Sequence, residues 1–236
     1  MQASRPASPQ HSRKLVCLAN SRKPPNGRCI AGIEIVDGSP SRWIRPVSSR
    51  QTEEVSARER QYQDGSEPSI LDIISVPLMG PKAEAHQQEN WLLDSAWYWL
   101  KVGTYPHADL HLLADAPGPL WTNGHSTYNG LNDYVPEQYA GAINTSLKLI
   151  YVDSMRLHVY QPGETFGDMR RRVQAEFSFA NESYSLWVTD PVIETNFKAQ
   201  PDGYHSLGAS YLTISLGAPY ASRCYKLVAT VIGANQ

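Results

Sequence analysis

The chain has 236 residues, of which 41% are hydrophobic and 19% charged, and its formal net charge is −2. This composition is typical of a soluble globular protein, and no stretch approaches the roughly 18 consecutive apolar residues of a membrane helix. We therefore expect a cytoplasmic location and no membrane partner.

The charges are unevenly distributed along the chain. The first fifty positions hold nine Lys and Arg against two Asp and Glu, a net charge of +7, whereas positions 51–236 hold twelve against 21, a net charge of −9. Arginine presents a rigid fork of donors that matches phosphate or carboxylate groups. The N-terminal part therefore predicts a site for an anionic ligand, and Trp43 beside these arginines favours a planar one.

Residues 1–13 are rich in Ser and Pro and lack an apolar core, which predicts a disordered lead-in and no secretory signal. Apolar runs at 14–19, 29–36 and 42–46 then predict strands, separated by the turn dipeptides Asn26-Gly27 and Asp37-Gly38. A further strand follows at 70–76, and Pro77 ends it. We expect residues 14–94 to form one small barrel.

The middle of the chain, residues 95–145, is less regular and rich in Trp, Pro and Gly. Segments 95–102 and 105–114 have apolar spacing compatible with helices, so we expect an irregular, partly helical connection. His107 and His111 have a spacing compatible with metal binding, but no third ligand follows at a suitable distance. We expect no metal and no cofactor.

The last part, residues 146–236, returns to β patterning and predicts a second barrel. Alternating apolar positions predict a hairpin over 172–188 with a turn at Asn181-Glu182. Asp190 followed by Pro191 predicts the start of a short helix, and 211–216 and 224–232 predict two closing strands. The cysteines Cys17, Cys29 and Cys224 form no CxxC pair, and we expect them to be buried thiols.

Several ordered motifs between residues 14 and 232 resemble the dual OB-fold domain family of bacterial genomes. They are LANSRKPPNGRCIAGIEI, WIRPVSSR, LDIISVPL, HQQENWLLD, LWVTDPVIE, YLTISLGAPY and CYKLVATVI. The resemblance implies an all-β fold with minor helices, in which two OB-like barrels are joined by an irregular, partly helical linker. It also implies recognition of nucleic acid or a nucleotide by a sensor component of a bacterial antiviral defence system, with no settled catalytic activity. A protein encoded in the same gene cluster is a further candidate partner.

An OB fold binds ligands through one face and its flanking loops, using ring stacking and phosphate contacts. We expect the early arginines and the HQQENW motif to form the principal site. The predicted ligand-binding residues are Ser21, Arg22, Lys23, Arg28, Trp43, Arg45, Arg50, Gln88, Glu89 and Asn90. Two structural alternatives stay open: the arginines can form a solvated basic edge that prevents strand pairing between molecules, and Glu89 can form a salt bridge to one of them.

The hairpin supplies a secondary predicted ligand-binding site, formed by Arg170, Arg171, Arg172 and Trp187. Phe177 and Phe179 share one strand face with Val173 and Ala175, so we expect both rings in the core. Trp187 points away from the face of its neighbours Leu186 and Val188, which makes it the better candidate for an exposed ring.

The favoured function is a recognition module without catalytic residues. The common hydrolase, P-loop, zincin and dinucleotide-binding motifs are absent from the sequence. One alternative is an enzyme that acts on a nucleotide or a modified nucleic acid, with His125 or Glu89 as the acid or base. A second alternative is an adaptor that docks a protein partner. DNA, RNA, single or double strands and free nucleotides all stay open as ligands.

Overall fold

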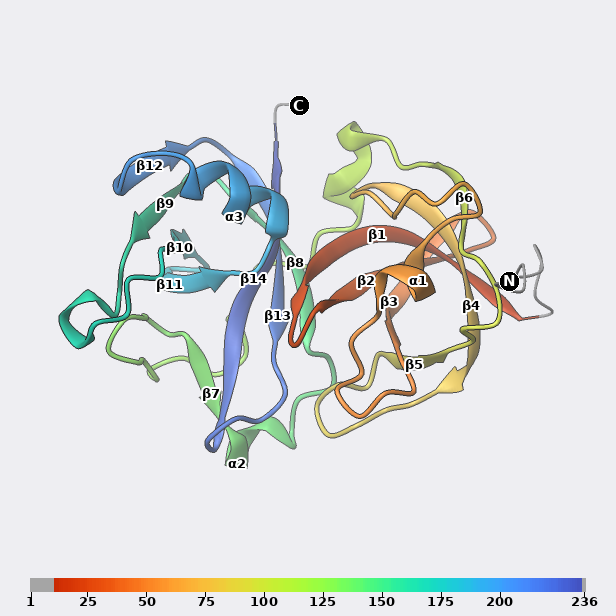
Figure 1. Cartoon of the computed structure of the whole chain (residues 1–236), viewed down its shortest axis with the longest axis horizontal. Helices are drawn as coiled ribbons and strands as arrows, with labels where there is room; N and C mark the ends of the chain where they lie inside the picture. Colours follow the sequence, from red (N-terminus) through yellow and green to blue (C-terminus); the bar gives the residue numbers. More distant parts are fainter. Residues whose placement is uncertain (1–10, 235–236) are drawn as a thin grey trace. The chain divides into compact units, whose positions relative to one another are not determined.

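The computed structural model describes residues 11–234, and these residues are dominated by β-strands (Figure 1). The chain divides into two units, Met1–Leu113 and Ala114–Gln236. The predicted fold class, all-β with minor helices and two OB-like barrels, is confirmed. Between residues 11 and 234, no helix is long and apolar enough to cross a membrane.

The first unit contains a closed five-stranded barrel and one additional strand. Its strands are β1 (Ser12–Lys23), β2 (Gly27–Val36), β3 (Ser39–Val47), β4 (Asp72–Pro81), β5 (Asn90–Leu93) and β6 (Leu100–Thr104). The hydrogen-bonded order is β1-β2-β3-β5-β4-β6, and β1 also pairs with β4, which closes the barrel. Strands β3 and β5 are parallel, and the other barrel pairs are antiparallel. This is a five-stranded barrel of the OB type.

Strand β1 closes the barrel because it bends enough to serve two neighbours. Its residues from Ser12 to Val16 pair with β4, and its residues from Leu15 to Lys23 pair with β2. The register between β1 and β2 shifts between Cys17 and Ala19, and such bulges increase the local bend of a strand. Gly32 of β2 is required opposite this region, because a Cβ there would lie 2.1 Å from the carbonyl oxygen of Val16.

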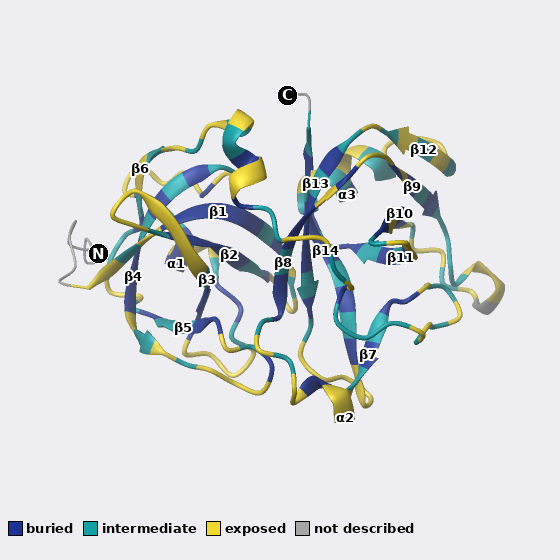
Figure 2. Cartoon of the chain, turned by 180° about the vertical axis from the view of Figure 1, so that it is seen from behind, coloured by how far each residue is buried: buried dark blue, intermediate teal, exposed yellow. Residues whose placement is uncertain are grey.

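The interior of the first barrel is apolar, and Figure 2 shows buried residues along its strands. The core includes Leu15, Cys17, Ile30, Ile44, Ile74, Val76 and Trp99. The predicted burial of thiols is confirmed for Cys17 and Cys224, whereas Cys29 is half-buried. Burial, together with the nearby Asp72 carboxylate, raises the pKa of the Cys17 thiol to about 12, so this thiol stays protonated.

The helices of the first unit are short. Helix α1 (Ala57–Arg60) begins after Ser56, whose hydroxyl accepts a hydrogen bond from the Glu59 N–H, while the Glu59 carboxylate accepts one from the Ser56 N–H. The helix expected over 95–102 is wrong, whereas the helical character expected over 105–114 is confirmed in part. The first segment contributes to β6, which pairs with the open edge of β4, and the second contains only the 3-10 helix η1 (His107–Leu112).

The second unit repeats the strand order of the first barrel with one interruption. Its strands are β7 (Tyr134–Pro136), β8 (Leu147–Val152), β9 (Met155–Tyr160), β10 (Arg172–Phe179), β11 (Glu182–Val188), β12 (Gly203–Leu207), β13 (Ser210–Leu216) and β14 (Arg223–Gly233). The order is β12-β9-β10-β11-β14-β13-β8, with β7 paired to β14. Strands β8 and β9 are two halves of one first strand, interrupted at Asp153 and Ser154. Like β3 and β5, strands β11 and β14 are parallel.

Local sequence patterns predicted much of the secondary structure of the second unit. Asp190 caps α3 (Pro191–Lys198) as predicted, since its Oδ1 accepts hydrogen bonds from the N–H groups of Val192 and Ile193. The predicted hairpin is present, but its turn lies one residue earlier, at Ala180 and Asn181, which both have positive φ angles. The remaining helices are α2 (Glu137–Ala140) and η2 (Glu164–Phe166).

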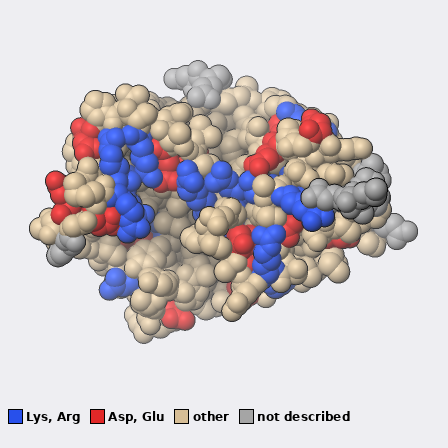
Figure 3. Space-filling model, viewed as in Figure 1, with Lys and Arg blue, Asp and Glu red and all other residues tan. Residues whose placement is uncertain are grey.

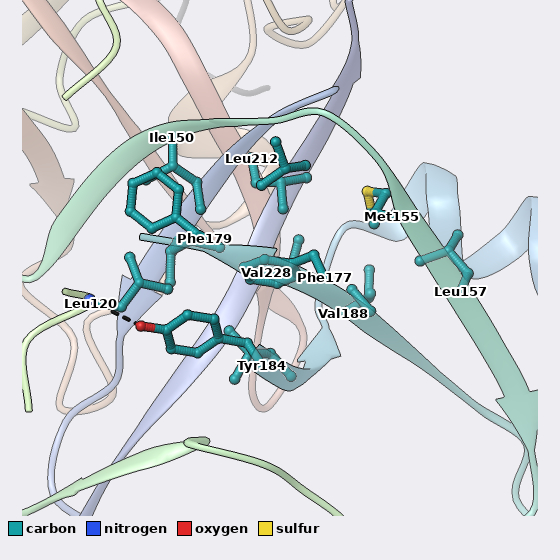
Figure 4. Close-up of a cluster of buried hydrophobic side chains, with 14 of the residues drawn as sticks. Leu120, Ile150, Met155, Leu157, Phe177, Phe179, Tyr184, Val188, Leu212 and Val228 are labelled. Atoms are coloured by element: carbon teal, nitrogen blue, oxygen red, sulfur yellow. Dashed lines mark hydrogen bonds between the residues drawn. The ribbon is translucent and has the colours of Figure 1, made fainter. Parts of the chain in front are cut away.

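The core of the second barrel is formed by side chains from six strands that point toward one another (Figure 4). The labelled residues include Ile150, Leu157, Phe177, Phe179, Leu212 and Val228. The predicted burial of Phe177 and Phe179 is confirmed. Because both rings fill this core, they are not available on the outer surface of the sheet.

The predicted connection, residues 95–145, is divided between the two units. Its later part packs on the second barrel, where the Leu120 N–H donates to the Tyr184 hydroxyl over 3.3 Å, the bond drawn in Figure 4. The Trp121 indole N–H donates to the Thr145 carbonyl over 2.8 Å. Residues 1–10 of the predicted lead-in 1–13 lie outside the described residues, and β1 already begins at Ser12.

Lys226 of β14 fastens the same segment from inside the barrel. Its side chain is fully buried, and its Nζ donates hydrogen bonds to the Thr122 carbonyl (2.8 Å) and to Asn123 Oδ1 (2.9 Å). The ammonium group also lies 5.4 Å from the centre of the Tyr184 ring. Burial lowers the pKa of Lys226 to about 8, because the charged form loses its hydration.

This lowered pKa predicts an unusual pH dependence of stability. An unfolded lysine titrates near pH 10.4, so between about pH 8 and 10 the unfolded chain holds a proton that the folded chain has released. The free energy of unfolding should therefore rise with pH, relative to Lys226→Met, by on the order of 1–3 kcal/mol. Denaturant titrations of both proteins at pH 7.5, 8.5 and 9.5 measure this difference, and a pH-independent difference would contradict the assignment.

Candidate functional site

Carboxylates of the first unit neutralise several of the N-terminal cations. Arg13 and Arg42 each lie 3.0 Å from a Glu34 carboxylate oxygen, and both guanidinium groups lie 5.0 Å from the centre of the Trp91 ring. The first unit as a whole has 13 Lys and Arg against 12 Asp and Glu, so its net charge is +1. The charge of +7 in the first fifty positions is thus balanced by carboxylates that follow within the same unit.

Arg45 and Glu89 form a buried ion pair. Strands β3 and β5 run parallel and place Arg45 opposite Asn90, next to Glu89. Arg45 Nη2 lies 3.1 Å from Glu89 Oε1, Nη1 donates to Asn90 Oδ1 over 3.2 Å, and both charged side chains are 4% exposed. The structural alternative for Glu89, a salt bridge to an early arginine, is therefore observed. This geometry gives both charges a role in holding β3 against β5.

Arg50 and Lys23 also have carboxylate partners. Arg50 contacts Glu54 at 3.3 Å and Glu59 at 2.9 Å, and Lys23 Nζ lies 3.9 Å from Glu53. These contacts fasten the connection between β3 and β4 to the barrel. Ligand binding by these side chains stays a prediction.

The other predicted residues of the first unit are dispersed. Ser21 is buried, whereas Arg22 is exposed and lies opposite Arg28 on the paired ends of β1 and β2. Trp43 is half-buried on β3, and Gln88 is exposed between β4 and β5. Figure 3 shows Lys and Arg interspersed with Asp and Glu on the viewed face. The structure brings Arg45, Glu89 and Asn90 together and leaves Arg22, Lys23 and Arg28 at the turn between β1 and β2.

A different cluster of side chains lies on the outer face of the second sheet. Along β9, β10 and β11, alternate residues point into the core, and the residues between them point outward. The strand register aligns Tyr204, His158, Gln174 and Trp187 in one row across four strands. Tyr160 is the next outward residue along β9.

Four aromatic rings on this face stack in sequence. His158 lies between Tyr204, at 4.2 Å with an interplanar angle of 15°, and Tyr160, at 4.0 Å with an angle of 9°. Tyr160 continues to Trp187 at 6.0 Å with an angle of 20°. We call Tyr204, His158, Tyr160 and Trp187 the aromatic row. Its inner ring faces contact one another, so only the rings at its two ends, Tyr204 and Trp187, have a face that no other ring of the row covers.

Each end of the aromatic row carries an arginine. The Arg156 guanidinium lies 4.4 Å from the centre of the Tyr204 ring, and that of Arg172 lies 6.0 Å from the centre of Trp187. Among the residues predicted for the secondary site, Arg172 and Trp187 are therefore brought together.

The other two arginines of that predicted site have acidic partners. Arg170 pairs with Asp168 and holds the pKa of that carboxyl at about 2, and Arg171 pairs with Asp202.

His158 adds an imidazole ring to the aromatic row, and this ring is uncharged at neutral pH. Burial between the tyrosines lowers its pKa, and Arg156 lowers it further, while Glu176 acts in the opposite direction. A neutral imidazole stacks between two rings without the cost of burying a cation. The row is therefore a stack of uncharged rings with a guanidinium group at each end, and that of Arg156 is paired with Glu176.

A cavity of about 810 Å³ lies beside the aromatic row. Its lining includes Arg156, Gln174 and Glu176 of the same outer face, together with residues 128–131. No group of three His, Cys, Asp or Glu residues in the described part of the chain is placed to hold a metal ion. Of the residues weighed as acid or base, Glu89 is in its ion pair and His125 packs against Tyr134 and Tyr139.

Three members of the aromatic row, His158, Tyr160 and Tyr204, were not predicted from the sequence. The alternation in β9, where Arg156, His158 and Tyr160 are separated by apolar residues, was a usable signal for an outward face. Tyr204 had no such signal, since its place depends on the pairing of β12 with β9.

Comparison with known proteins supports the assignment of the fold. A family model described as the dual OB-containing domain matches residues 13–231. No curated protein and no solved structure gave a match.

The buried pair of Arg45 and Glu89 predicts strong coupling between two substitutions. Arg45→Met should lower the free energy of unfolding by roughly 3–5 kcal/mol, because it leaves Glu89 buried without its cation. Combining it with Glu89→Leu should recover most of this loss, whereas Arg22→Gln, at an exposed position, should have little effect. Denaturant titrations of the wild type, the single variants Arg45→Met and Glu89→Leu, the double variant and the Arg22→Gln control measure the coupling. Additive losses would show that the two charges do not depend on each other.

Proposed function

The chain belongs to the dual OB-containing domain family, and on that premise we propose that it binds single-stranded nucleic acid through the outer face of β9, β10, β11 and β12. The fold is that of a general nucleic-acid or ligand-binding module. The observation that carries the finer proposal is the aromatic row with an arginine at each end.

The chemistry of the row suits unpaired bases. An aromatic ring stacks on any base, and each such contact contributes on the order of 1–3 kcal/mol. A guanidinium plane on a ring can itself stack against a base and can also contact a phosphate. In a duplex the base faces are already stacked within the helix, so they cannot reach Tyr204 or Trp187. The face therefore favours single strands over duplexes.

The net charge of the second unit limits how much phosphate contacts can contribute to the binding affinity. This unit has eight Lys and Arg against 11 Asp and Glu, a net charge of −3. For single strands, the slope of log affinity against log salt is about −0.7 for each neutralised phosphate. Arg156 is paired with Glu176, so one contact, from Arg172, gives a slope of about −0.7. Binding that depends mainly on phosphates would be far more sensitive to salt.

A second location for the same function is the turn between β1 and β2 in the first barrel. Arg22, Lys23 and Arg28 lie there, and the corresponding loop of an OB fold flanks its ligand. Arg22→Ala with Arg28→Ala would weaken binding if the first unit contributes. The implied role as a sensor in a bacterial defence system stays a prediction based on the resemblance.

Substitution at the ends of the aromatic row tests the proposal. Trp187→Ala and Tyr204→Ala should each lower affinity for a labelled single-stranded 12-mer by about 5- to 150-fold, the equivalent of about 1–3 kcal/mol. Fluorescence anisotropy at 50 and 200 mM salt measures the affinity and its salt slope, with a duplex of the same sequence as a second ligand.

Tyr151→Ala is the matched control, because Tyr151 is an exposed tyrosine on β8 that packs against Tyr211 away from this face. Equal losses in Tyr151→Ala and Trp187→Ala, or tighter binding of the duplex, would overturn the proposed site.

A further inference from the structure

We propose that the cavity beside the aromatic row is a pocket for one nucleobase that carries an exocyclic amino group. This inference rests on the proposed function and deepens it, since it adds base preference to a surface that otherwise stacks any base. The cavity volume of about 810 Å³ lies within the range of ligand pockets in proteins.

The cavity forms where the first strand of the barrel is interrupted. Asp153 and Ser154, between β8 and β9, are exposed and line it. A second wall is the segment 128–131, which is held beside β11 by two backbone hydrogen bonds between Leu131 and Ser185, at 3.2 and 3.0 Å. The Gln174 side chain donates a further hydrogen bond to the Asn129 carbonyl. Both walls are therefore fixed to the sheet by the chain itself.

The pocket adjoins the aromatic row in the strand register. Gln174 of β10 lies between His158 and Trp187 of the aromatic row in the register. Arg156 lies two residues from His158 on β9, and Glu176 lies two residues from Gln174 on β10. Two residues span about 7 Å of a strand. Gln174 is thus a neighbour of the aromatic row and also lines the cavity. A single-stranded nucleic acid that stacks one base on the aromatic row can thus place a neighbouring base in the pocket.

The lining favours a base edge that donates hydrogen bonds. Carboxylates of Glu176 and Asp153 line the cavity together with the hydroxyl groups of Ser185 and Ser206. Arg156 holds Glu176 in place, with 2.7 Å between the guanidinium and Glu176 Oε2. A carboxylate accepts a hydrogen bond from the amino group of cytosine, whereas uracil presents a carbonyl oxygen at the same position and is repelled.

An exposed ring stands at the mouth of the pocket. Tyr128 lines the cavity and is 96% exposed, which is unusual for a large aromatic side chain. A ring in this place can stack on the face of a base whose edge contacts Glu176. Stacking and edge recognition therefore come from different sides of the same cavity.

The test compares oligo(dC) and oligo(dU) 12-mers at pH 8, because these bases differ only in the edge at C4 and N3: cytosine has an amino group beside an unprotonated N3, and uracil has a carbonyl oxygen beside an N3–H. We expect wild-type protein to bind oligo(dC) at least about fivefold more tightly. Glu176→Gln should reduce this preference to about twofold or less, because an amide can also donate to the uracil oxygen. Glu182→Gln, which removes a carboxylate from an exposed position of the same hairpin outside the cavity, should retain it.

A second measurement separates the pocket from the aromatic row. Cytidine monophosphate should shift the backbone amide resonances of Ser185 and Ser206 in a two-dimensional NMR spectrum more strongly than uridine monophosphate does. Equal binding of both oligomers that still depends on Trp187 would overturn the pocket and leave the proposed function intact. Amide shifts with cytidine monophosphate but no oligomer binding would support the pocket and overturn the proposed function. No response to any of the four ligands would overturn both.

Discussion

In each barrel, closure depends on one strand that pairs with two neighbours in different directions. In the first unit, β1 stays continuous, and it bends through a bulge between Cys17 and Ala19 opposite Gly32. In the second unit, the equivalent strand is broken at Asp153 and Ser154, so β8 pairs with β13 and β9 pairs with β10. The bend in β1 lets the first barrel complete its backbone hydrogen bonds, and the break between β8 and β9 does the same for the second barrel.

The break also distinguishes the two units in what they offer to a ligand. Where β1 continues, the nearby side chains form ion pairs such as those of Glu34 with Arg13 and Arg42. Where the strand is interrupted, a cavity opens beside stacked rings. Charges that are paired within the protein lose much of their attraction for a phosphate, whereas an exposed ring face keeps its affinity for a base. The uneven charge along the sequence therefore does not locate the favoured site.

The fold was more predictable than the site, because local patterns determine strands, turns and caps. Asp190 before Pro191, and the alternation that buries Phe177 and Phe179, involve residues a few positions apart. The Arg45 and Glu89 pair depends on the parallel alignment of β3 with β5, which no local pattern reveals. The aromatic row likewise joins Tyr204, His158 and Trp187 from three strands. Sequence alone indicated Trp187 as an outward ring but not the rings stacked beside it.

The buried Lys226 connects the core of the second barrel with the wall of the cavity. It fastens Thr122 and Asn123, and the chain continues through Asn132, whose side-chain amide donates to the Ser183 carbonyl over 3.0 Å. Residues 128–131 lie between these fixed points, so their backbone is already held near the sheet before a ligand binds. A wall that is ordered in advance lowers the entropy lost on binding. The cost of burying an ammonium group in this barrel is thereby linked to the shape of the surface at which we propose that the ligand binds.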